Sequence, residues 1–450
     1  MKHVDGMSNN DPFPNSSEDL ALITLRKVTL RLLPFLFLLY VVAWLDRVNV
    51  GFAALQMNSD LGLSAAAFGF GSGIFFAGYC LFEVPSNIIL ERVGARRWIG
   101  RIMVSWGLIS IAMMFVRQAT SFWILRFLLG VAEAGFFPGV IYYLSLWYPS
   151  AQRARAIAAF MVAVPVTGVL GGPLSGALLG LSGLWGLRGW QWLFLLEGLP
   201  AVILGVVALI YLTDDPKNAK WLTSAERDWL IRAMAVDRAA SKPAHAIGAL
   251  RALANGTIWQ LGITFFLAAI GFYGYTFWSP ILIKSLLGIG DLGVGLVSAA
   301  ISVVTIAGML LNSIHSDRTD ERSLHVAIPL LIMGIGLFGC ALLPETGFAV
   351  LLMALIPLGH CGSYGPFWSI PMRFLRGPAA ASGVALVATI ASVGGFVGPT
   401  LIGALKDRTG THVLAFMLLG VFGIAAALLS LCLRRSKDLR DRGFAKSIAA

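Results

Sequence analysis

Twelve apolar stretches, each about as long as a membrane-spanning helix, constrain the fold of this chain more than any other feature. An α-helix needs about 20 consecutive apolar residues to cross the hydrocarbon core of a bilayer. The 450-residue chain is 57% hydrophobic and only 13% charged, which is more apolar surface than a water-soluble core could bury. We therefore predict an all-α membrane protein with twelve transmembrane helices. The stretches lie at roughly residues 31–54, 65–90, 97–116, 120–147, 154–180, 190–212, 257–283, 292–313, 324–343, 347–370, 379–404 and 411–433.

The longest polar interval, residues 214–256, divides these stretches into two groups of six. We interpret residues 31–213 and 257–433 as two pseudo-symmetric six-helix bundles with a central cavity between them. The interval that joins them is predicted to be a cytoplasmic linker. Residues 1–30 are expected to form a disordered cytoplasmic N-terminal tail, and residues 434–450 a basic cytoplasmic C-terminal tail.

The distribution of Lys and Arg predicts the orientation, because cytoplasmic loops retain these residues. With the N-terminus inside, all but seven of the 34 Lys and Arg residues fall in cytoplasmic segments. Both termini are therefore expected in the cytoplasm, and the net charge of +11 reflects membrane topology rather than a nucleic-acid partner. The seven exceptions are Arg47 and Arg126 inside spans and Arg117, Arg188, Lys284, Lys406 and Arg408 on the outside.

An acid followed by Arg recurs at the cytoplasmic end of the second span of each half. An acid at such a place can pair with basic groups and with the positive N-terminus of a neighbouring helix, and so hold one conformation closed. Alternatively, each copy is a basic loop that only fixes the topology. We predict a conformational latch made of Glu91, Arg92, Gly94, Arg96 and Arg97 in the first copy and Asp317 and Arg318 in the second.

Two spans of the first half contain charged residues far from their ends. Asp46 and Arg47 lie in the first span, and Arg126 and Glu133 lie seven residues apart, on one face of the fourth. A charge at the centre of a span costs at least about 2.5–3.5 kcal/mol, so such groups are either functional or paired. The alternative to a functional role is purely structural pairing, of Asp46 with a neighbouring Arg and of Glu133 with Arg126.

Several segments resemble a known family. The loop Asn87 to Arg97 resembles the signature Gly-x-Leu-x-Asp-Arg-x-Gly-x-Arg-Arg of the major facilitator superfamily, with Asn87 in place of Gly and Glu91 in place of Asp. Within it, the chain is similar to the anion:cation symporter family, whose bacterial members carry tartrate, phthalate, hydroxyphenylacetate and galactonate. The segments that carry this resemblance are Asp46–Ala53, Phe82–Asn87, Arg126–Gly139, Pro366–Pro371 and Gly394–Pro399.

The resemblance implies roles for particular residues. Asp46 and Glu133 match positions that family members use for protonation, Arg47 matches a position that binds the substrate carboxylate, and Tyr79 matches a cavity position. The second half has no acid well inside a span, so we expect its polar and aromatic side chains to bind the body of the substrate. The remaining candidates for substrate binding are Arg126, Tyr275, Trp278, Trp368, Ser369 and Ser392, and the roles of Glu83, Glu197 and His360 stay open.

These expectations combine into a proton-coupled symporter that takes up an organic anion, a small hydroxy-, di- or aromatic carboxylate, by alternating access. Many family members have two Asn side chains where this chain has Ala388 and Ser392, which favours a smaller or more aromatic anion over a sugar acid. The alternatives are an exporter or uncoupled facilitator of organic anions, and a nutrient sensor that does not transport. The sequence shows no metal-ligand cluster, cofactor motif or catalytic motif, and we expect a non-enzymatic monomer in a bacterial inner membrane.

Overall fold

The computed structural model describes residues 17–240, 256–343, 347–374 and 378–448. Within these ranges, twelve helices are long and apolar enough to cross a membrane, which confirms the predicted spans. The helices of the first half are α1 (Ser17–Asp60), α2 (Ala65–Val93), α3 (Ala95–Ala112), α4 (Ala119–Glu133), α5 (Phe136–Trp147), α6 (Ser150–Met161), α7 (Ala163–Leu179) and α8 (Gly189–Tyr211). Those of the second half are α11 (Gly256–Leu287), α12 (Asp291–Thr319), α13 (Ser323–Leu342), α14 (Phe348–Gly362), α15 (Tyr364–Phe374), α16 (Pro378–Thr409) and α17 (Val413–Ile448).

Six of these helices pair up to make three spans, and shorter elements connect the rest. α4 with α5 forms the fourth span, α6 with α7 forms the fifth, and α14 with α15 forms the tenth. The linker contains α9 (Ser224–Ala240), and single 3-10 turns lie at Met113–Phe115, Leu184–Gly186 and Pro216–Asn218. Of the predicted N-terminal tail, residues 1–16 lie outside the described residues and the rest begins α1. Of the predicted C-terminal tail, α17 includes all but the last two residues, which are not described.

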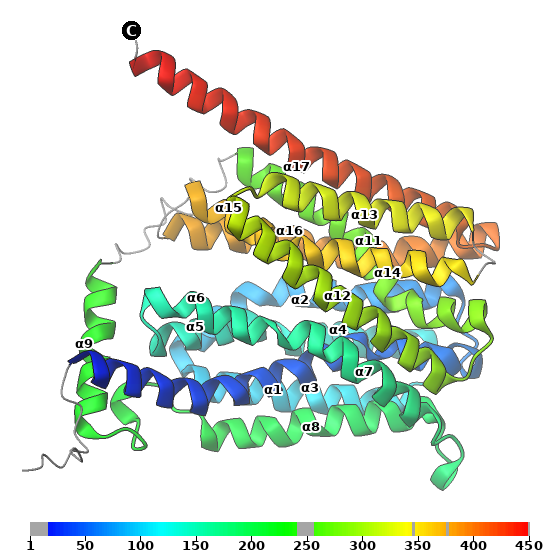
Figure 1. The fold of residues 1–450 in the computed structure, drawn as a ribbon. Helices are drawn as coiled ribbons and strands as arrows, with labels where there is room; N and C mark the ends of the chain where they lie inside the picture. Colours follow the sequence, from blue (N-terminus) through cyan, green and yellow to red (C-terminus); the bar gives the residue numbers. More distant parts are fainter. Residues whose placement is uncertain (1–16, 241–255, 344–346, 375–377, 449–450) are drawn as a thin grey trace, which may run out of the picture.

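The two halves form two layers of helices, with the first half below the second in Figure 1. The start of α1, the linker helix α9 and the end of α17 all lie at the same end of the molecule (Figure 1). We call this the inner end and the opposite one the outer end, following the orientation that the charge distribution predicts. α2 packs on α16, α7 on α12 and α1 on α11, so three pairs of helices join the halves.

These three contacts lie toward the outer end. The backbones of α7 and α12 touch where an added Cβ on Gly172 would lie 2.5 Å from the carbonyl oxygen of Gly295. Farther along α2, Cys80 and Glu83 lie beside Ser392 and Thr389 of α16. Leu81 and Val84, on another side of the helix, are 65% and 64% exposed. The halves are therefore in backbone contact toward the outer end and in side-chain contact farther along α2.

A break between α4 and α5 sets the position of Glu133, the last residue of α4. Pro138 has no N–H group to donate to the carbonyl of Ala134, and Gly135 adopts a left-handed φ of 86°. The carbonyl oxygen of Ala134 accepts a hydrogen bond from Ser86 Oγ of α2 instead, at 2.7 Å. A side chain of a neighbouring helix thus satisfies the broken backbone, as it must inside a bilayer.

Candidate functional site

The Arg47 side chain of α1 forms an ion pair with Glu133 of α4. Arg47 Nη2 donates to Glu133 Oε1, and the two side chains are 12% and 1% exposed. The pair is incompletely satisfied, because Arg47 Nε and Glu133 Oε2 have no hydrogen-bond partner. A buried pair with an unused donor and an unused acceptor can exchange one partner for an incoming anion or proton.

Aromatic rings from both halves surround the Arg47 guanidinium. The ring centroids of Trp44, Phe75 and Tyr79 lie 5.1, 5.4 and 5.3 Å from Arg47 Cζ, within the range of a cation–π interaction. Tyr273 of α11 lies beside the same guanidinium. Side chains of both halves thus surround the positive charge of Arg47.

Tyr40 also belongs to this group, and the sequence analysis missed it. Its ring stacks on Phe160 with a centroid distance of 4.5 Å, and it interacts electrostatically with Arg47. Tyr40 precedes Arg47 by seven residues, almost two helical turns, so both lie on the same face of α1. This spacing, which placed Arg126 and Glu133 together, could also have identified Tyr40.

The carboxylate of Asp46 points away from Arg47 toward α3. It accepts hydrogen bonds from Trp106 Nε1 at 2.7 Å, from Ser110 Oγ at 2.9 Å and from Asn49 Nδ2 at 3.2 Å. Asp46 is 1% exposed. Asp46 and Arg47, although adjacent in α1, therefore have different surroundings. Arg47 faces the second half, and Asp46 faces the core of the first.

Arg126 is fully buried against α2. Its Nε and Nη2 donate to the carbonyl oxygens of Gly71 and Ser72, each at 3.3 Å, and Nη1 has no partner. Although Arg126 and Glu133 share a helix face, the carboxylate of Glu133 bonds Arg47. Arg126 instead donates hydrogen bonds to backbone carbonyl groups of the second span.

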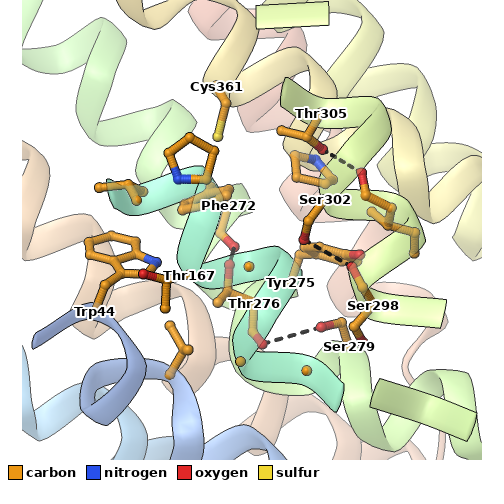
Figure 2. A pocket seen from close by; sticks show the side chains of 18 of the residues that line it. Trp44, Thr167, Phe272, Tyr275, Thr276, Ser279, Ser298, Ser302, Thr305 and Cys361 are labelled. Atoms are coloured by element: carbon orange, nitrogen blue, oxygen red, sulfur yellow. Dashed lines mark hydrogen bonds between the residues drawn. The ribbon is translucent and has the colours of Figure 1, made fainter. Parts of the chain in front are cut away.

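A cavity of about 130 Å³ lies between α1, α7, α11, α12 and α14 (Figure 2). Trp44, whose ring centroid lies 5.1 Å from Arg47 Cζ, also forms part of the cavity wall. Tyr275, a predicted substrate residue, lines this cavity and is 5% exposed. The other hydroxyl groups in its wall belong to Thr167, Ser175, Thr276, Ser279, Ser298, Ser302 and Thr305.

Most of the hydroxyl protons in this wall are already donated. Ser298, Ser302 and Thr305 of α12 each donate to the carbonyl four residues earlier, at 2.9 Å. Ser175 of α7 donates to Glu197 at 2.7 Å. The oxygens that face the cavity therefore act mainly as acceptors, which suits a guest that brings its own hydroxyl donors.

The remaining predicted substrate residues lie in three separate places. Trp278 is buried at the outer contact between the halves, where its Nε1 donates to the carbonyl of Pro399 at 3.3 Å. Trp368 packs on Phe265 at a centroid distance of 5.2 Å, and Ser369 donates to Pro366 at 2.7 Å within α15. The structure thus does not bring these three side chains to the Arg47 pair.

Three further candidates from the sequence analysis are polar residues outside the Arg47 pair. Two of them lie near the interface of α2 and α16, and the third lies in α14. Ser392 of α16 donates to Ala388 at 3.0 Å and lies beside Cys80 of α2. Glu83 of α2 faces Thr389 of α16. His360 of α14 is buried and stacks on Phe272 at a centroid distance of 4.2 Å.

The hydrogen bonds and ion pairs of the two predicted latch motifs do not join one half to the other among the described residues. Arg96 donates to Asp214 at the start of the linker through its backbone N–H and Nε, at 2.7 and 3.3 Å. In the second copy, Asp317 pairs with Arg322 at 2.6 Å. Gly94 ends α2 with a φ of 96°. The side chains of Glu91, Arg92, Arg97 and Arg318 are exposed.

Comparison with known proteins assigns the family. The family model described as Major Facilitator Superfamily matches residues 36–399. The chain belongs to the major facilitator superfamily. Its members are membrane transporters rather than enzymes, so the predicted fold class and family are confirmed, and the twelve helices are the two six-helix halves of a multi-pass transporter.

Relatives within the superfamily carry several names. A protein of Agrobacterium vitis named "Putative tartrate transporter" is 48% identical over 93% of this chain and 96% of its own length. The "Putative metabolite transport protein NicT" of Pseudomonas putida is 45% identical over 86% of this chain and 88% of its own length. The "Quinolone resistance transporter" of Acinetobacter baumannii is 38% identical over 90% of this chain and 94% of its own length.

Solved structures of the superfamily have the same fold. A bacterial homologue of the human lysosomal transporter Spinster, in an inward-facing occupied conformation, matches with a TM-score of 0.71 at 18% identity, over 92% of this chain and 97% of that one. The inward open conformation of the xylose transporter XylE from E. coli matches with a TM-score of 0.69 at 15% identity, over 90% and 96% of the two chains. These likenesses show that the chain shares the fold of these transporters.

Proposed function

We propose that this transporter is a symporter that takes up a small organic anion together with protons. The observation that carries the proposal is the ion pair between Arg47 and Glu133, buried between the halves and ringed by aromatic side chains. In this pair, Arg47 can bind a negatively charged substrate group and Glu133 can bind a proton. Asp46, the second acid of the same region, is proposed to contribute to protonation as well.

Competition for Arg47 supplies the coupling. A substrate carboxylate that binds the Arg47 guanidinium in bidentate fashion through Nε and Nη2 takes the Nη2 donor that Glu133 uses, and so displaces the carboxylate of Glu133. The displaced Glu133 is then a buried charge without a partner, which favours uptake of a proton. Each anion that binds therefore brings one proton to Glu133, and release of the anion returns Glu133 to Arg47 and the proton to water.

The cavity in Figure 2 supports a hydroxy acid as the substrate. Its hydroxyl oxygens act mainly as acceptors, so substrate hydroxyl groups can donate to them while the carboxylate reaches Arg47 past Trp44. Relatives named as tartrate transporters are consistent with this class. A small hydroxy acid also agrees with the loss of two amides in α16, which favoured a smaller or more aromatic anion over a sugar acid.

Uptake into proteoliposomes tests the proposal. Purified protein is reconstituted, and accumulation of labelled tartrate is followed with an acidic exterior and, separately, with equal pH on both sides. We expect accumulation above the external concentration only with the pH gradient, and none with Arg47→Ala. A flux that is the same with and without the gradient would rule out proton coupling, and the absence of uptake for hydroxy, dicarboxylic and aromatic acids would rule out the substrate class.

A second candidate function is export, since a relative that is 38% identical is named for quinolone resistance. Inside-out vesicles separate the two directions. Uptake of a fluoroquinolone into such vesicles, with tartrate failing to compete, would favour the exporter.

A further inference from the structure

Glu197 of α8 is a buried acid that the Arg47 pair does not use. It is 1% exposed, and Ser175 Oγ donates to its Oε1 at 2.7 Å. Its second oxygen, Oε2, has no hydrogen-bond partner. A carboxylate that is buried with one donor for two oxygens is poorly satisfied as an anion.

Asn49 of α1 lies between this acid and Asp46. Its Nδ2 donates to Asp46 Oδ1 at 3.2 Å, and its side chain also faces the carboxyl group of Glu197. Asn49 is 1% exposed, and its Oδ1 has no partner. Among the described residues, Asn49 Oδ1 and Glu197 Oε2 are thus two buried acceptors without a hydrogen-bond donor.

A proton on Glu197 relieves this shortage of donors, because a protonated carboxyl group has one oxygen that donates and needs fewer donors than a carboxylate. Asp46, in contrast, has three donors and is fully satisfied as an anion. The surroundings favour the same distribution, because two ionised carboxylates that share one buried bridge repel each other.

Among the described residues, no positively charged group interacts with Glu197. Asp46 on α1 is the ionisable group that interacts with it among the described residues, and Ser175 on α7 and Asn49 on α1 are its hydrogen-bonding neighbours. From α3, Gly107 and Ile111 pack against the adjacent Gly198. The charge of the cluster is therefore set by how many protons the two acids hold.

We propose that Asp46 and Glu197, bridged by Asn49, form a second acid pair that carries one proton, held by Glu197 in this conformation. The Asn49 amide donates to Asp46 through Nδ2, which favours the ionised form of Asp46. Rotation of this amide by half a turn places Oδ1 there instead and shifts the preference for the proton toward Asp46. Asn49 therefore influences which acid is protonated.

Ser175 connects this pair to the cavity in Figure 2. It donates to Glu197 and also forms part of the cavity wall. The proton is thus one hydroxyl group away from the space that we assign to the substrate. This part of the inference, a role in the transport cycle, rests on the proposed symport; the protonation of the pair does not.

Infrared spectroscopy of the reconstituted protein at neutral pH tests the protonation. We expect the wild type to show a carbonyl-stretch band of a protonated carboxylic acid that Glu197→Gln removes and Asp46→Asn leaves in place. Asp228→Asn, on the exposed face of the linker helix, is the matched acid-to-amide control and leaves the band unchanged. A band that survives Glu197→Gln, or that Asp46→Asn removes, would overturn the assignment.

A second variant keeps the acid and changes only its environment. Ser175→Ala removes the hydrogen bond to the Glu197 carbonyl oxygen, so we expect the same band to move to higher frequency at unchanged intensity. A band that does not move would contradict the assignment even if the Glu197 variant fails to fold.

The number of protons carried per anion tests the role in transport. We expect Glu197→Gln to exchange labelled for unlabelled tartrate as the wild type does, while carrying fewer protons per anion. An unchanged proton-to-anion ratio would show that the pair takes no part in the cycle. If the wild type itself moves no protons, the proposed symport fails, whereas the infrared result still decides whether the pair is protonated.

Discussion

Asp407, near the outer end of α16, accepts a hydrogen bond of 3.0 Å from the backbone N–H of Ala65, the first residue of α2. Its other oxygen accepts from the N–H of Ala66 at 2.9 Å. The second half thus caps the N-terminus of a helix in the first half, where the helix dipole favours a negative charge. On the opposite side of the bundle, Gln56 of α1 donates to Asp291 of α12 at 2.8 Å. The two hydrogen bonds of Asp407 and the one between Gln56 and Asp291 hold the outer end closed.

Asp407→Asn should open the outer end more often, because it removes the charge and one of the two acceptors. An exposed cap of this kind contributes about 0.5–1 kcal/mol, which corresponds to about a two- to fivefold shift in population. We expect faster labelling of Ala54→Cys, a position 4% exposed, by an impermeant maleimide in a background without the native cysteines. Asp60→Asn is the control, since Asp60 bonds Trp190 within its own half. Equal labelling rates for the two variants would contradict the capping role.

Arg47→Ala should abolish anion binding and also destabilise the protein, because it leaves Glu133 buried without its partner. Loss of one member of a buried pair costs about 3–5 kcal/mol. Adding Glu133→Gln to Arg47→Ala removes the uncompensated charge, so we expect the double variant to regain most of the thermal stability without regaining binding. The checks are unfolding temperature and the increase in that temperature with tartrate. A double variant as unstable as the single one would show that the two residues are not coupled.

Glu133→Gln should bind the anion without taking up a proton. Where Glu133 is ionised in the free protein, anion binding to the wild type consumes one proton, so the apparent affinity should fall by about tenfold per pH unit as the pH rises. The variant has no such proton to bind, and its affinity should stay flat over the same range while exchange continues and accumulation is lost. Isothermal titration at several pH values gives both slopes. Parallel slopes would exclude Glu133 as the site of coupled protonation.

The linker helix α9 should be held to α1 by an ion pair that fails in acid. Lys27 Nζ lies 2.5 Å from Glu226 Oε1, and Thr223 N–H donates to Oε2 at 2.9 Å. Burial raises the pKa of Glu226, but these bonds outweigh it and hold the pKa below its ordinary value of 4.5. The stabilisation is thus complete above pH 4.5 and is lost as the pH falls through the lower, folded-state pKa.

Lys27→Met should therefore reduce the protection of α9 amides from hydrogen exchange, corrected for intrinsic rates, at neutral pH. Because Lys27 is 47% exposed, we expect a loss of about 0.2–1 kcal/mol, which shrinks in acid. Lys217→Met, an exposed lysine of the same linker, should leave α9 unaffected. A difference between the Lys27 variant and the wild type that does not change with pH would contradict the pairing.

The spans could be predicted from the sequence because bilayer thickness sets the length of each apolar stretch. Local detail depended on contacts between helices. The break after Glu133 requires Pro138 together with Ser86, which lies on another helix. The inner turns of α1 are helical from Ser17, although their polar composition indicated a tail.

The candidate site was predictable where spacing within one helix defines a face, and less so elsewhere. Sequence reasoning selected Arg47 and Glu133, but which of the two Arg residues bonds Glu133 depends on the packing of α1 against α4. Tyr275 and Trp278 were both expected to bind substrate as polar or aromatic side chains of the second half, yet in the structure Tyr275 lines the cavity and Trp278 lies in the outer contact. Glu197 and Ser175 come from different helices, so no sequence spacing could reveal their hydrogen bond.

The backbone contact between Gly172 and Gly295 has a consequence for the energy supply of the cell. Two helices that touch without intervening side chains leave no room for a continuous file of water molecules, and such files conduct protons. A membrane that stores energy as a proton gradient loses it through any such file, and two missing methyl groups close that route between α7 and α12.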